Sequence, residues 1–168
     1  LDGGTSWSAR SVATPPPLNA LAGVSWRSAW VVGDGGAVLR TTNSGDTWLR
    51  RDIALGGHLL AVAAVNEDLA WVVPGGTGPQ GQGVFKTTDG GQNWAAASDA
   101  YFGGTIGAIT VDPQNADVVW VGGGETDIRG NTAGGDGLWK TTDGGKKWAP
   151  LGFKDEHIAA IRIHPTNQ

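Results

Sequence analysis

An eight-residue motif recurs along this chain and restricts its fold more than any other feature. Three complete copies align without gaps, TTNSGDTW at 41–48, TTDGGQNW at 87–94 and TTDGGKKW at 141–148, and DGGTSW at 2–7 is the end of a fourth. Their spacing of about 40 to 55 residues suits either a four-stranded propeller blade or a small helical repeat. The segments between the motifs decide between the two.

These intervening segments have the character of β-strands. A second repeat lies upstream of each motif, SAWVVGD at 28–34, LAWVVPG at 69–75 and VVWVGGG at 118–124, and an alternating segment such as IGAITVDP at 106–113 precedes it. They are short, rich in Val and Trp, and bounded by Gly, Asp, Asn or Pro. No stretch has a sustained apolar stripe of helical period. The pattern of each unit therefore predicts four antiparallel strands, A to D, and the motif forms the turn between C and D.

The motif has the composition of a tight turn. Glycine accepts a positive φ, and an Asp carboxylate can accept hydrogen bonds from nearby backbone amides. The Asn of the 41–48 copy can make the same bond. We expect the Trp that ends each motif to anchor the hairpin in the core. The residues given this structural role are Asp2, Asn43, Asp89, Asp143, Trp7, Trp48, Trp94 and Trp148.

The predicted fold is all-β, a β-propeller of four-stranded antiparallel blades, present as an incomplete arc of a ring of about six to eight blades. The arc comprises one D strand, three full blades and one A strand. An open arc exposes apolar blade faces and unpaired edges, so we expect the remaining blades to come from the same or another chain. The predicted units are the end of a blade at 1–13, blades at 18–54, 59–99 and 106–152, and the start of the next at 158–168.

Composition excludes several partners and cofactors. A net charge of −4, without a block of like charges, argues against nucleic acid and against an anionic membrane. The longest apolar run, 59–65, is too short to span a bilayer. With no Cys, and with His58, His157 and His164 lacking ligand spacing, no metal site is expected. The Gly-rich stretches lack the context of a nucleotide site, so no cofactor is expected either.

The motifs identify the chain as a member of the Asp-box, or BNR, propeller superfamily. The first half, including DGGTSWSARSVATPPPLNALAGVSWRSAWVVGDGGAVLRTTNSGDTW, resembles the photosystem II stability and assembly factor family. The second half, including IGAITVDPQNADVVWVGGGE and GDGLWKTTDGGKKWAPLG, more closely resembles bacterial sortilin-like and xyloglucanase-like propellers. The resemblance implies an extracytoplasmic location (periplasmic, lumenal or secreted), and a ligand site on the face opposite the Asp boxes.

Strand alternation predicts which loops build that opposite face. Since strands in a blade alternate in direction, the B–C and D–A loops share a face and the Asp boxes lie on the other. The B–C loop lengthens from blade to blade, and long loops on a rigid scaffold are where binding groups concentrate. The candidate binding residues are Glu125, Asp127, Arg129, Asn131 and Asp136 of the longest B–C loop, with Tyr101, Asp155 and Glu156 of the D–A loops.

We interpret the chain as a non-catalytic binding or scaffold module, an accessory or assembly subunit that contacts a protein partner, with a membrane-associated complex as one candidate. The alternative is a carbohydrate-active propeller, glycoside hydrolase or sialidase-like, whose catalytic residues lie partly outside these 168 residues. Glycoside hydrolysis requires a positioned pair of carboxyl groups, and the candidate loops do contain acids. A sialidase site needs several Arg and a Tyr nucleophile, whereas Tyr101 is the sole tyrosine. Whether the chain is an enzyme stays open, and we favour the non-catalytic interpretation.

Overall fold

The computed structural model describes residues 5–6, 8–9, 12, 16–55, 57–75, 83–124 and 135–164. Within these ranges the secondary structure consists of β-strands and one short 3-10 turn, η1 (Asp34–Gly36), with no α-helix. The strands of the first sheet are β1 (Leu18–Gly23), β2 (Ala29–Gly33), β3 (Val38–Thr41) and β4 (Leu49–Arg50). The second sheet has β5 (Leu59–Ala64), β6 (Ala70–Pro74), β7 (Phe85–Thr87) and β8 (Ala95–Ala96). The third has β9 (Ile106–Val111), β10 (Val119–Gly123), β11 (Leu138–Thr141) and β12 (Ala149–Gly152).

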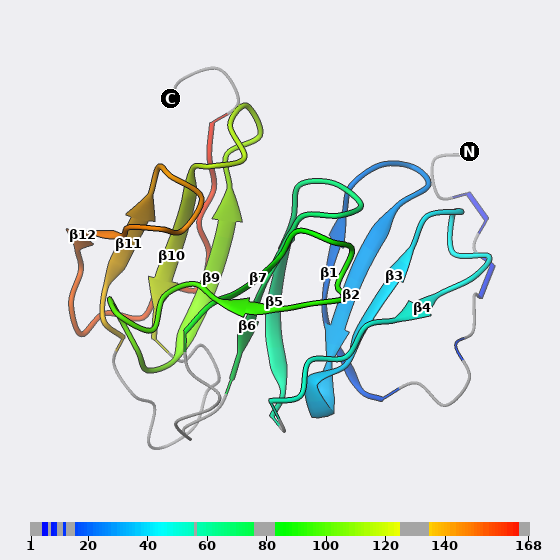
Figure 1. Cartoon of the computed structure of the whole chain (residues 1–168), viewed down its shortest axis with the longest axis horizontal. Helices are drawn as coiled ribbons and strands as arrows, with labels where there is room; N and C mark the ends of the chain where they lie inside the picture. Colours follow the sequence, from blue (N-terminus) through cyan, green and yellow to red (C-terminus); the bar gives the residue numbers. More distant parts are fainter. Residues whose placement is uncertain are drawn as a thin grey trace.

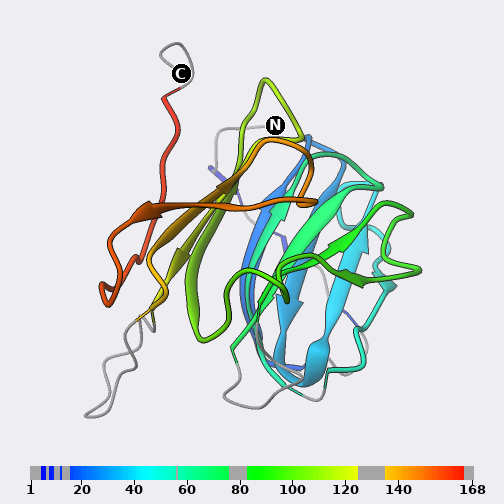
Figure 2. The same cartoon turned by 60° about the vertical axis from the view of Figure 1, so that its left-hand side comes forward.

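Each sheet is a meander in which sequence neighbours are also hydrogen-bonded neighbours. All pairings are antiparallel, and the strand order in every sheet follows the chain. The first strands lie together, since β1 contacts β5 and β5 contacts β9, and the three sheets stand side by side (Figures 1 and 2). The chain is therefore an arc of antiparallel β-propeller blades, as the repeat predicts.

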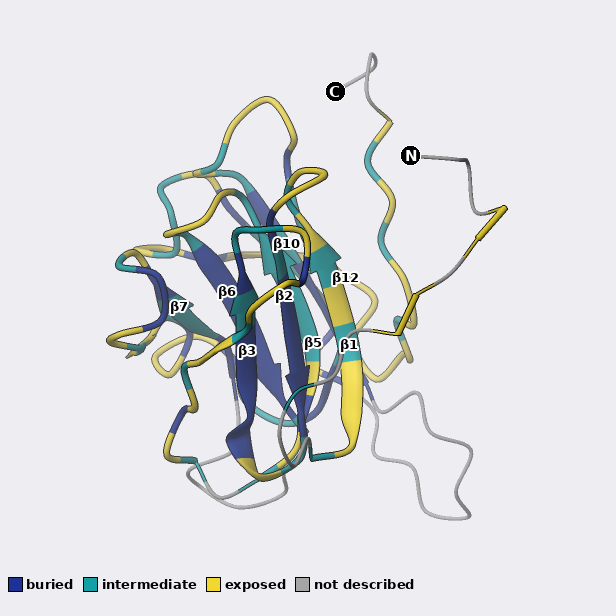
Figure 3. Ribbon diagram, turned by 90° about the vertical axis from the view of Figure 1, so that its right-hand side faces the viewer, coloured by how far each residue is buried: buried dark blue, intermediate teal, exposed yellow. Residues whose placement is uncertain are grey.

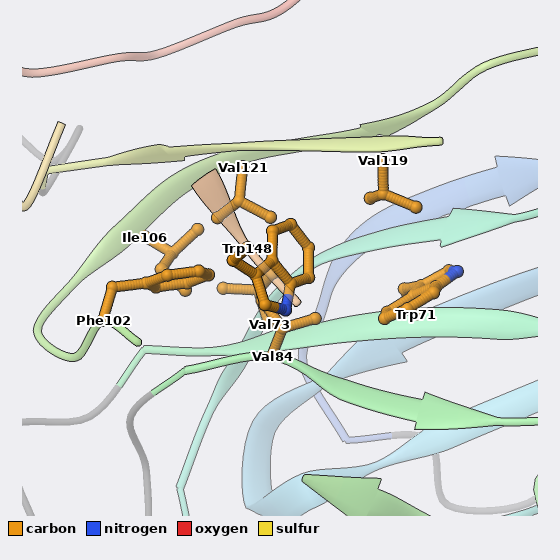
Figure 4. Packing of buried hydrophobic residues seen from close by; sticks show 8 residues of the cluster. All are labelled: Trp71, Val73, Val84, Phe102, Ile106, Val119, Val121 and Trp148. Carbon is orange, nitrogen blue, oxygen red and sulfur yellow. The ribbon is translucent and has the colours of Figure 1, made fainter. Parts of the chain in front are cut away.

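The hydrophobic core lies between the sheets, where the second strand of each blade is mostly buried. Strands β2 and β6 are buried along nearly their whole length, whereas β1 is mostly exposed (Figure 3). Alternation along β6 divides its side chains between two clusters. Val72 packs with the first sheet, and Trp71 and Val73 pack with the third (Figure 4).

The Asp boxes are turns held by the Asp side chain and the Thr two residues before it. In the second box Asp89 Oδ1 accepts hydrogen bonds from Thr87 Oγ1 at 2.9 Å and from the backbone N–H of Asn93 at 2.9 Å. The third box repeats both bonds at Asp143 with the same distances. In the first box the amide oxygen of Asn43 accepts from the backbone N–H of Thr47 at 3.0 Å. An amide therefore replaces the carboxylate without changing the turn.

The box tryptophans do not stay within their own blade. Trp94 of the second sheet lies edge-on to Trp30 of the first, and Trp148 of the third lies edge-on to Trp71 of the second. Trp148 is buried, while Trp94 and Trp48 are half-buried. The second and third boxes therefore anchor their blades to the preceding ones. The sequence predicted only that the Trp anchors the hairpin, without naming the blade it contacts.

We expect Asp89→Asn to lower the free energy of unfolding at neutral pH and to have less effect in acid. The backbone N–H of Asn93, followed by its side-chain amide, lowers the pKa of Asp89 to about 2, against about 3.9 for an unfolded Asp. A carboxyl group with a depressed folded-state pKa stabilises the fold above the unfolded pKa, and that stabilisation is lost as the pH falls through the folded pKa. The difference in Tm between chain and variant should therefore shrink from about pH 4 towards about pH 2.

The matched control for this titration is Asn43→Asp, which introduces the carboxylate at the equivalent position of the first box. The Tm of this variant should depend on acidic pH through the new carboxylate, whereas Asp89→Asn should lose that dependence. Thermal unfolding at several pH values measures both. A constant difference in Tm across the acid range would show that the carboxylate charge has no role in the turn.

The expected partial blades at the two ends of the chain are not seen as strands in the described residues. Residues 158–164 are described but form no strand, although 158–168 was expected to begin a blade. A strand requires a partner for its backbone groups, and no described strand pairs with these residues. The D strand expected within 1–13 lies largely outside the described residues.

Candidate functional site

Backbone hydrogen bonds join the B–C and D–A loops on the side away from the Asp boxes. At the first sheet the N–H of Gly36 donates to Gly57 O at 2.7 Å. At the third sheet the N–H of Gly124 donates to Thr105 O at 2.8 Å, and the N–H of Asp155 donates to Gly135 O at 2.9 Å. We call this surface the loop face; its described residues are 33–37, 53–55, 57–58, 75, 97–106, 122–124, 135–137 and 152–158.

A small polar cluster occupies the loop face at the first sheet. Asp34 Oδ1 accepts hydrogen bonds from Asn19 Nδ2 at 2.9 Å and from His58 Nδ1 at 2.7 Å. The Asn19 amide also donates to Leu59 O at 3.0 Å, which connects the cluster to the second sheet. The hydrogen bond from Asn19, followed by that from His58, lowers the pKa of Asp34. These hydrogen bonds thus favour the charged form of the Asp34 carboxyl at the start of η1.

At the third sheet the loop face carries two of the predicted acids on a short loop with unusual backbone geometry. Phe153 and Asp155 adopt left-handed conformations, with φ of 59° and 66°. The N–H of Glu156 donates to Phe153 O at 3.2 Å, closing the turn between them. A bulky residue with positive φ is uncommon, and such conformations concentrate at functional sites. The Phe153 side chain is 63% exposed.

Asp136 lies on the same face beside an aromatic cluster. Its Oδ2 accepts a hydrogen bond from the N–H of Gly103 at 3.1 Å, and its backbone carbonyl accepts one from Trp139 Nε1 at 2.9 Å. The Trp139 ring packs against Phe102 with ring centroids 5.1 Å apart. Asp136 is thereby fixed in place while its side chain stays accessible to solvent.

The structure brings together only some of the predicted site residues. Asp136, Asp155 and Glu156 share the loop face at the third sheet. Tyr101 belongs to a loop of this face, but its hydroxyl reaches away from these acids and donates to Lys146 O of the third Asp box at 3.1 Å. The other candidates, Glu125, Asp127, Arg129 and Asn131, lie outside the described residues, as do Asp2 and Trp7.

Sequence reasoning missed two features of this face. Phe153 belongs to an expected D–A loop, but nothing in the pattern GFKDE marks it as exposed in a left-handed conformation. The pair of His58 and Asp34 was also missed, although its signal was available. His58 ends a D–A loop and Asp34 begins a B–C loop, and strand alternation assigns both loops to the loop face.

The described arrangement supports binding more directly than catalysis. Exposed carboxylates accept charge-assisted hydrogen bonds from Lys or Arg of a partner. An exposed aromatic ring beside them provides apolar contact area, and aromatic anchors dominate many interfaces. The loop face at the third sheet therefore suits a peptide or protein segment with basic and apolar side chains.

Three radial four-stranded sheets joined by Asp-box turns define an Asp-box β-propeller. A scan against family models matches residues 1–116 to the photosynthesis system II assembly factor YCF48. The chain belongs to this family. A search of the curated proteins finds no match.

Solved structures with the same fold come from assembly factors and from glycoside hydrolases. YCF48 from Cyanidioschyzon merolae is 24% identical, with a TM-score of 0.60 over 88% of this chain and 40% of that one. YCF48 bound to a D1 peptide is 22% identical, with a TM-score of 0.56 over 80% and 40%. An ancestral GH74 enzyme is 19% identical, with a TM-score of 0.65 over 90% of this chain and 20% of that one. The chain spans about two fifths of the length of the YCF48 structures.

The described part of the chain offers no helix with the length and apolar character needed to cross a bilayer.

Proposed function

We propose that this chain is a non-catalytic binding module that uses its loop face to hold a segment of a partner protein during assembly of a membrane-associated photosystem complex. Membership in the YCF48 assembly-factor family supports the assembly role. A similar propeller is known with a D1 peptide bound, which supports a peptide as the kind of ligand. We also propose an extracytoplasmic location, as the family resemblance implies.

The observation that carries the proposal is the exposed ring of Phe153, held with a φ of 59° next to Asp155 and Glu156. Exposing an aromatic ring while constraining its backbone opposes stability, so a binding role explains both features. Neighbouring carboxylates would orient a basic partner segment and exclude an acidic one. The partner segment we infer therefore combines Lys or Arg with an apolar anchor.

The test measures the affinity of the chain for a synthetic D1 peptide by fluorescence anisotropy. We expect Phe153→Ala to weaken binding about tenfold or more, the effect typical of an aromatic hot spot. The matched control is Leu21→Ala, which removes an apolar side chain of similar exposure, 66%, from β1. Leu21→Ala should leave the affinity unchanged.

A charge test separates specific binding from apolar adhesion. The double variant Asp155→Lys and Glu156→Lys should weaken binding of a basic peptide, and raising the salt concentration should weaken binding to the original chain. Absence of measurable binding, or equal losses for Phe153→Ala and Leu21→Ala, would refute the assigned face.

The alternative is a carbohydrate-active propeller. The observation that favours this alternative is the structural likeness to GH74 enzymes. A xyloglucanase activity would release reducing ends from xyloglucan and would be lost in Asp155→Asn or Glu156→Gln if these acids took part. If the original chain released reducing ends and these variants did not, the binding proposal would be wrong and the chain would be an enzyme. The proposed function predicts no release.

A further inference from the structure

A cavity of about 460 Å³ lies where the A–B turns of the three blades meet. These turns are on the side of the Asp boxes, because the backbone N–H of Gly144 in the third box donates to Asp117 O of the third A–B turn at 3.0 Å. We call this space the axial cavity. The lining residues are Gly23, Val24, Ala64, Val65, Val111, Asp112, Pro113, Gln114 and Ala116.

The axial cavity lies at the ends of β1, β5 and β9, the first strands of the three blades. These strands contact one another from blade to blade. The blades of a propeller surround a central channel, so strands that meet in this way border the channel. The axial cavity is therefore at the Asp-box end of the channel, away from the loop face.

Three of the lining residues, Val24, Val65 and Asp112, occupy the same position in the repeat. Each directly follows the first strand of its blade. The backbone N–H of each donates to a carbonyl on the far side of its own turn, at 2.9 to 3.0 Å. The repeat thus places a valine at this position twice and an aspartate once.

The carboxyl group of Asp112 is buried in this wall. Asp112 is 6% exposed, and its Oδ1 accepts a hydrogen bond from the backbone N–H of Gln114 at 2.8 Å. Within the described part of the chain, no Lys, Arg or His forms an ion pair with it. Burying a charged carboxylate without a cation is costly. The wall therefore suits a cation that comes from outside the chain.

The charge of Asp112 is not needed to form the turn. In the second blade the amide oxygen of Asn66 holds the A–B turn, where it accepts hydrogen bonds from the backbone N–H of Asp68 at 2.8 Å and of Leu69 at 2.7 Å. A neutral amide oxygen can accept the bond from Gln114 in the same way. The negative charge thus calls for a separate explanation.

The rest of the wall is mainly apolar and suits the hydrocarbon part of a ligand. A lysine side chain combines such a stem with a terminal ammonium that donates strong hydrogen bonds to a carboxylate. A polyamine would find one carboxylate for its several charges, and the described residues gather no group of three or more His, Cys, Asp or Glu that could hold a metal ion. The apolar lining residues are Val24, Ala64, Val65, Val111, Pro113 and Ala116.

We propose that the axial cavity binds a lysine side chain of a partner protein. The hydrocarbon stem packs against the apolar side chains of the three A–B turns, and the ammonium donates a hydrogen bond to the Asp112 carboxylate. This contact is on the Asp-box side and does not depend on the proposed function of the loop face.

The test measures binding of Nα-acetyl-lysine N-methylamide to the original chain by heteronuclear NMR titration. We expect chemical-shift changes at the backbone N–H groups of Val24, Val65 and Gln114, one from each blade. The matched probe is Nα-acetyl-norleucine N-methylamide, which has a similar stem but no ammonium. It should bind about tenfold more weakly, because it cannot make the charge-assisted hydrogen bond.

The variant Asp112→Asn removes the charge and keeps an oxygen for the N–H of Gln114, so thermal unfolding should show a folded chain. Its affinity for the lysine probe should fall about tenfold, to the level of the norleucine probe. The control is Asp117→Asn, which removes an acid from the same turn but outside the cavity lining. This control should leave the affinity unchanged.

Equal binding of the two probes, no measurable binding of the lysine probe, or an unchanged affinity in Asp112→Asn would overturn the proposal. Spermidine tests the other source of the same chemistry. If spermidine bound more tightly than the lysine probe, the occupant would be a free polyamine and the proposed lysine would be wrong. Phe153→Ala should not alter binding of the lysine probe, which keeps this test separate from that of the loop face.

Discussion

Trp148→Ala is expected to remove about 3 to 5 kcal/mol from the free energy of unfolding, the loss typical of truncating a buried Trp. Trp148 is 5% exposed and contacts both Trp71 and Phe102, so its removal opens a cavity between the second and third sheets. It also leaves Ala97 O without its hydrogen bond from the indole. Thermal unfolding should show a fall in Tm of about 10 °C.

The control for this truncation is Trp26→Ala, because Trp26 is 71% exposed. Its loss should change the free energy of unfolding by less than about 0.5 kcal/mol. A small effect of Trp148→Ala, comparable with that of Trp26→Ala, would mean that the contact of Trp148 with Trp71 does not hold the second and third sheets together.

Gly145→Ala should destabilise the chain by about 3 to 5 kcal/mol, combining backbone strain with a clash. Gly145 has a φ of 90°, and a Cβ there would lie 2.7 Å from Cη2 of Trp71. Trp71 is fully buried in the core between the second and third sheets. The box of the third blade would be forced away from the second sheet.

The variant Gly104→Ala separates the backbone strain from the clash with Trp71. Gly104 has a similar φ of 75°, but a Cβ at this position would meet no atom within 4 Å. Gly104→Ala should therefore cost only the strain of the left-handed conformation, about 1 to 2 kcal/mol. Urea unfolding of both variants measures the difference, and equal losses would exclude the clash with Trp71.

The sequence predicted the blade architecture because its evidence is local. Gly, Asp and Thr at fixed offsets specify the turn in residues 87–94, and the alternation around Trp30 and Trp71 specifies strands covered on both faces. Strand direction then assigns the loops to faces without any knowledge of packing. The three sheets and the shared face of the B–C and D–A loops follow from these two facts.

Contacts between blades could not be predicted from the sequence in the same way. Periodicity shows that Trp148 faces inward, but it does not show whether the partner is in its own blade or in the preceding one. Tyr101 illustrates the consequence, because its loop was assigned to the binding face while its hydroxyl reaches Lys146 in an Asp box. The positions of such residues depend on how far the short β8 extends, which no pattern specifies.

The candidate site was predictable as a face and less so as individual residues. Asp136, Asp155 and Glu156 follow from strand alternation and loop length. The exposure of Phe153 depends on its left-handed backbone, and the pairing of Asp34 with His58 depends on the distance between two loops. Such tertiary geometry leaves little trace in a single sequence.

The tryptophan contacts between consecutive blades are the central feature of this chain, and NOE spectroscopy of the indoles tests them most directly. The structure predicts cross-peaks between Trp148 and Trp71 and between Trp94 and Trp30, pairs that belong to consecutive blades. Absence of both, together with cross-peaks between Trp94 and Trp71 of the same blade, would contradict a propeller joined through its Asp-box tryptophans.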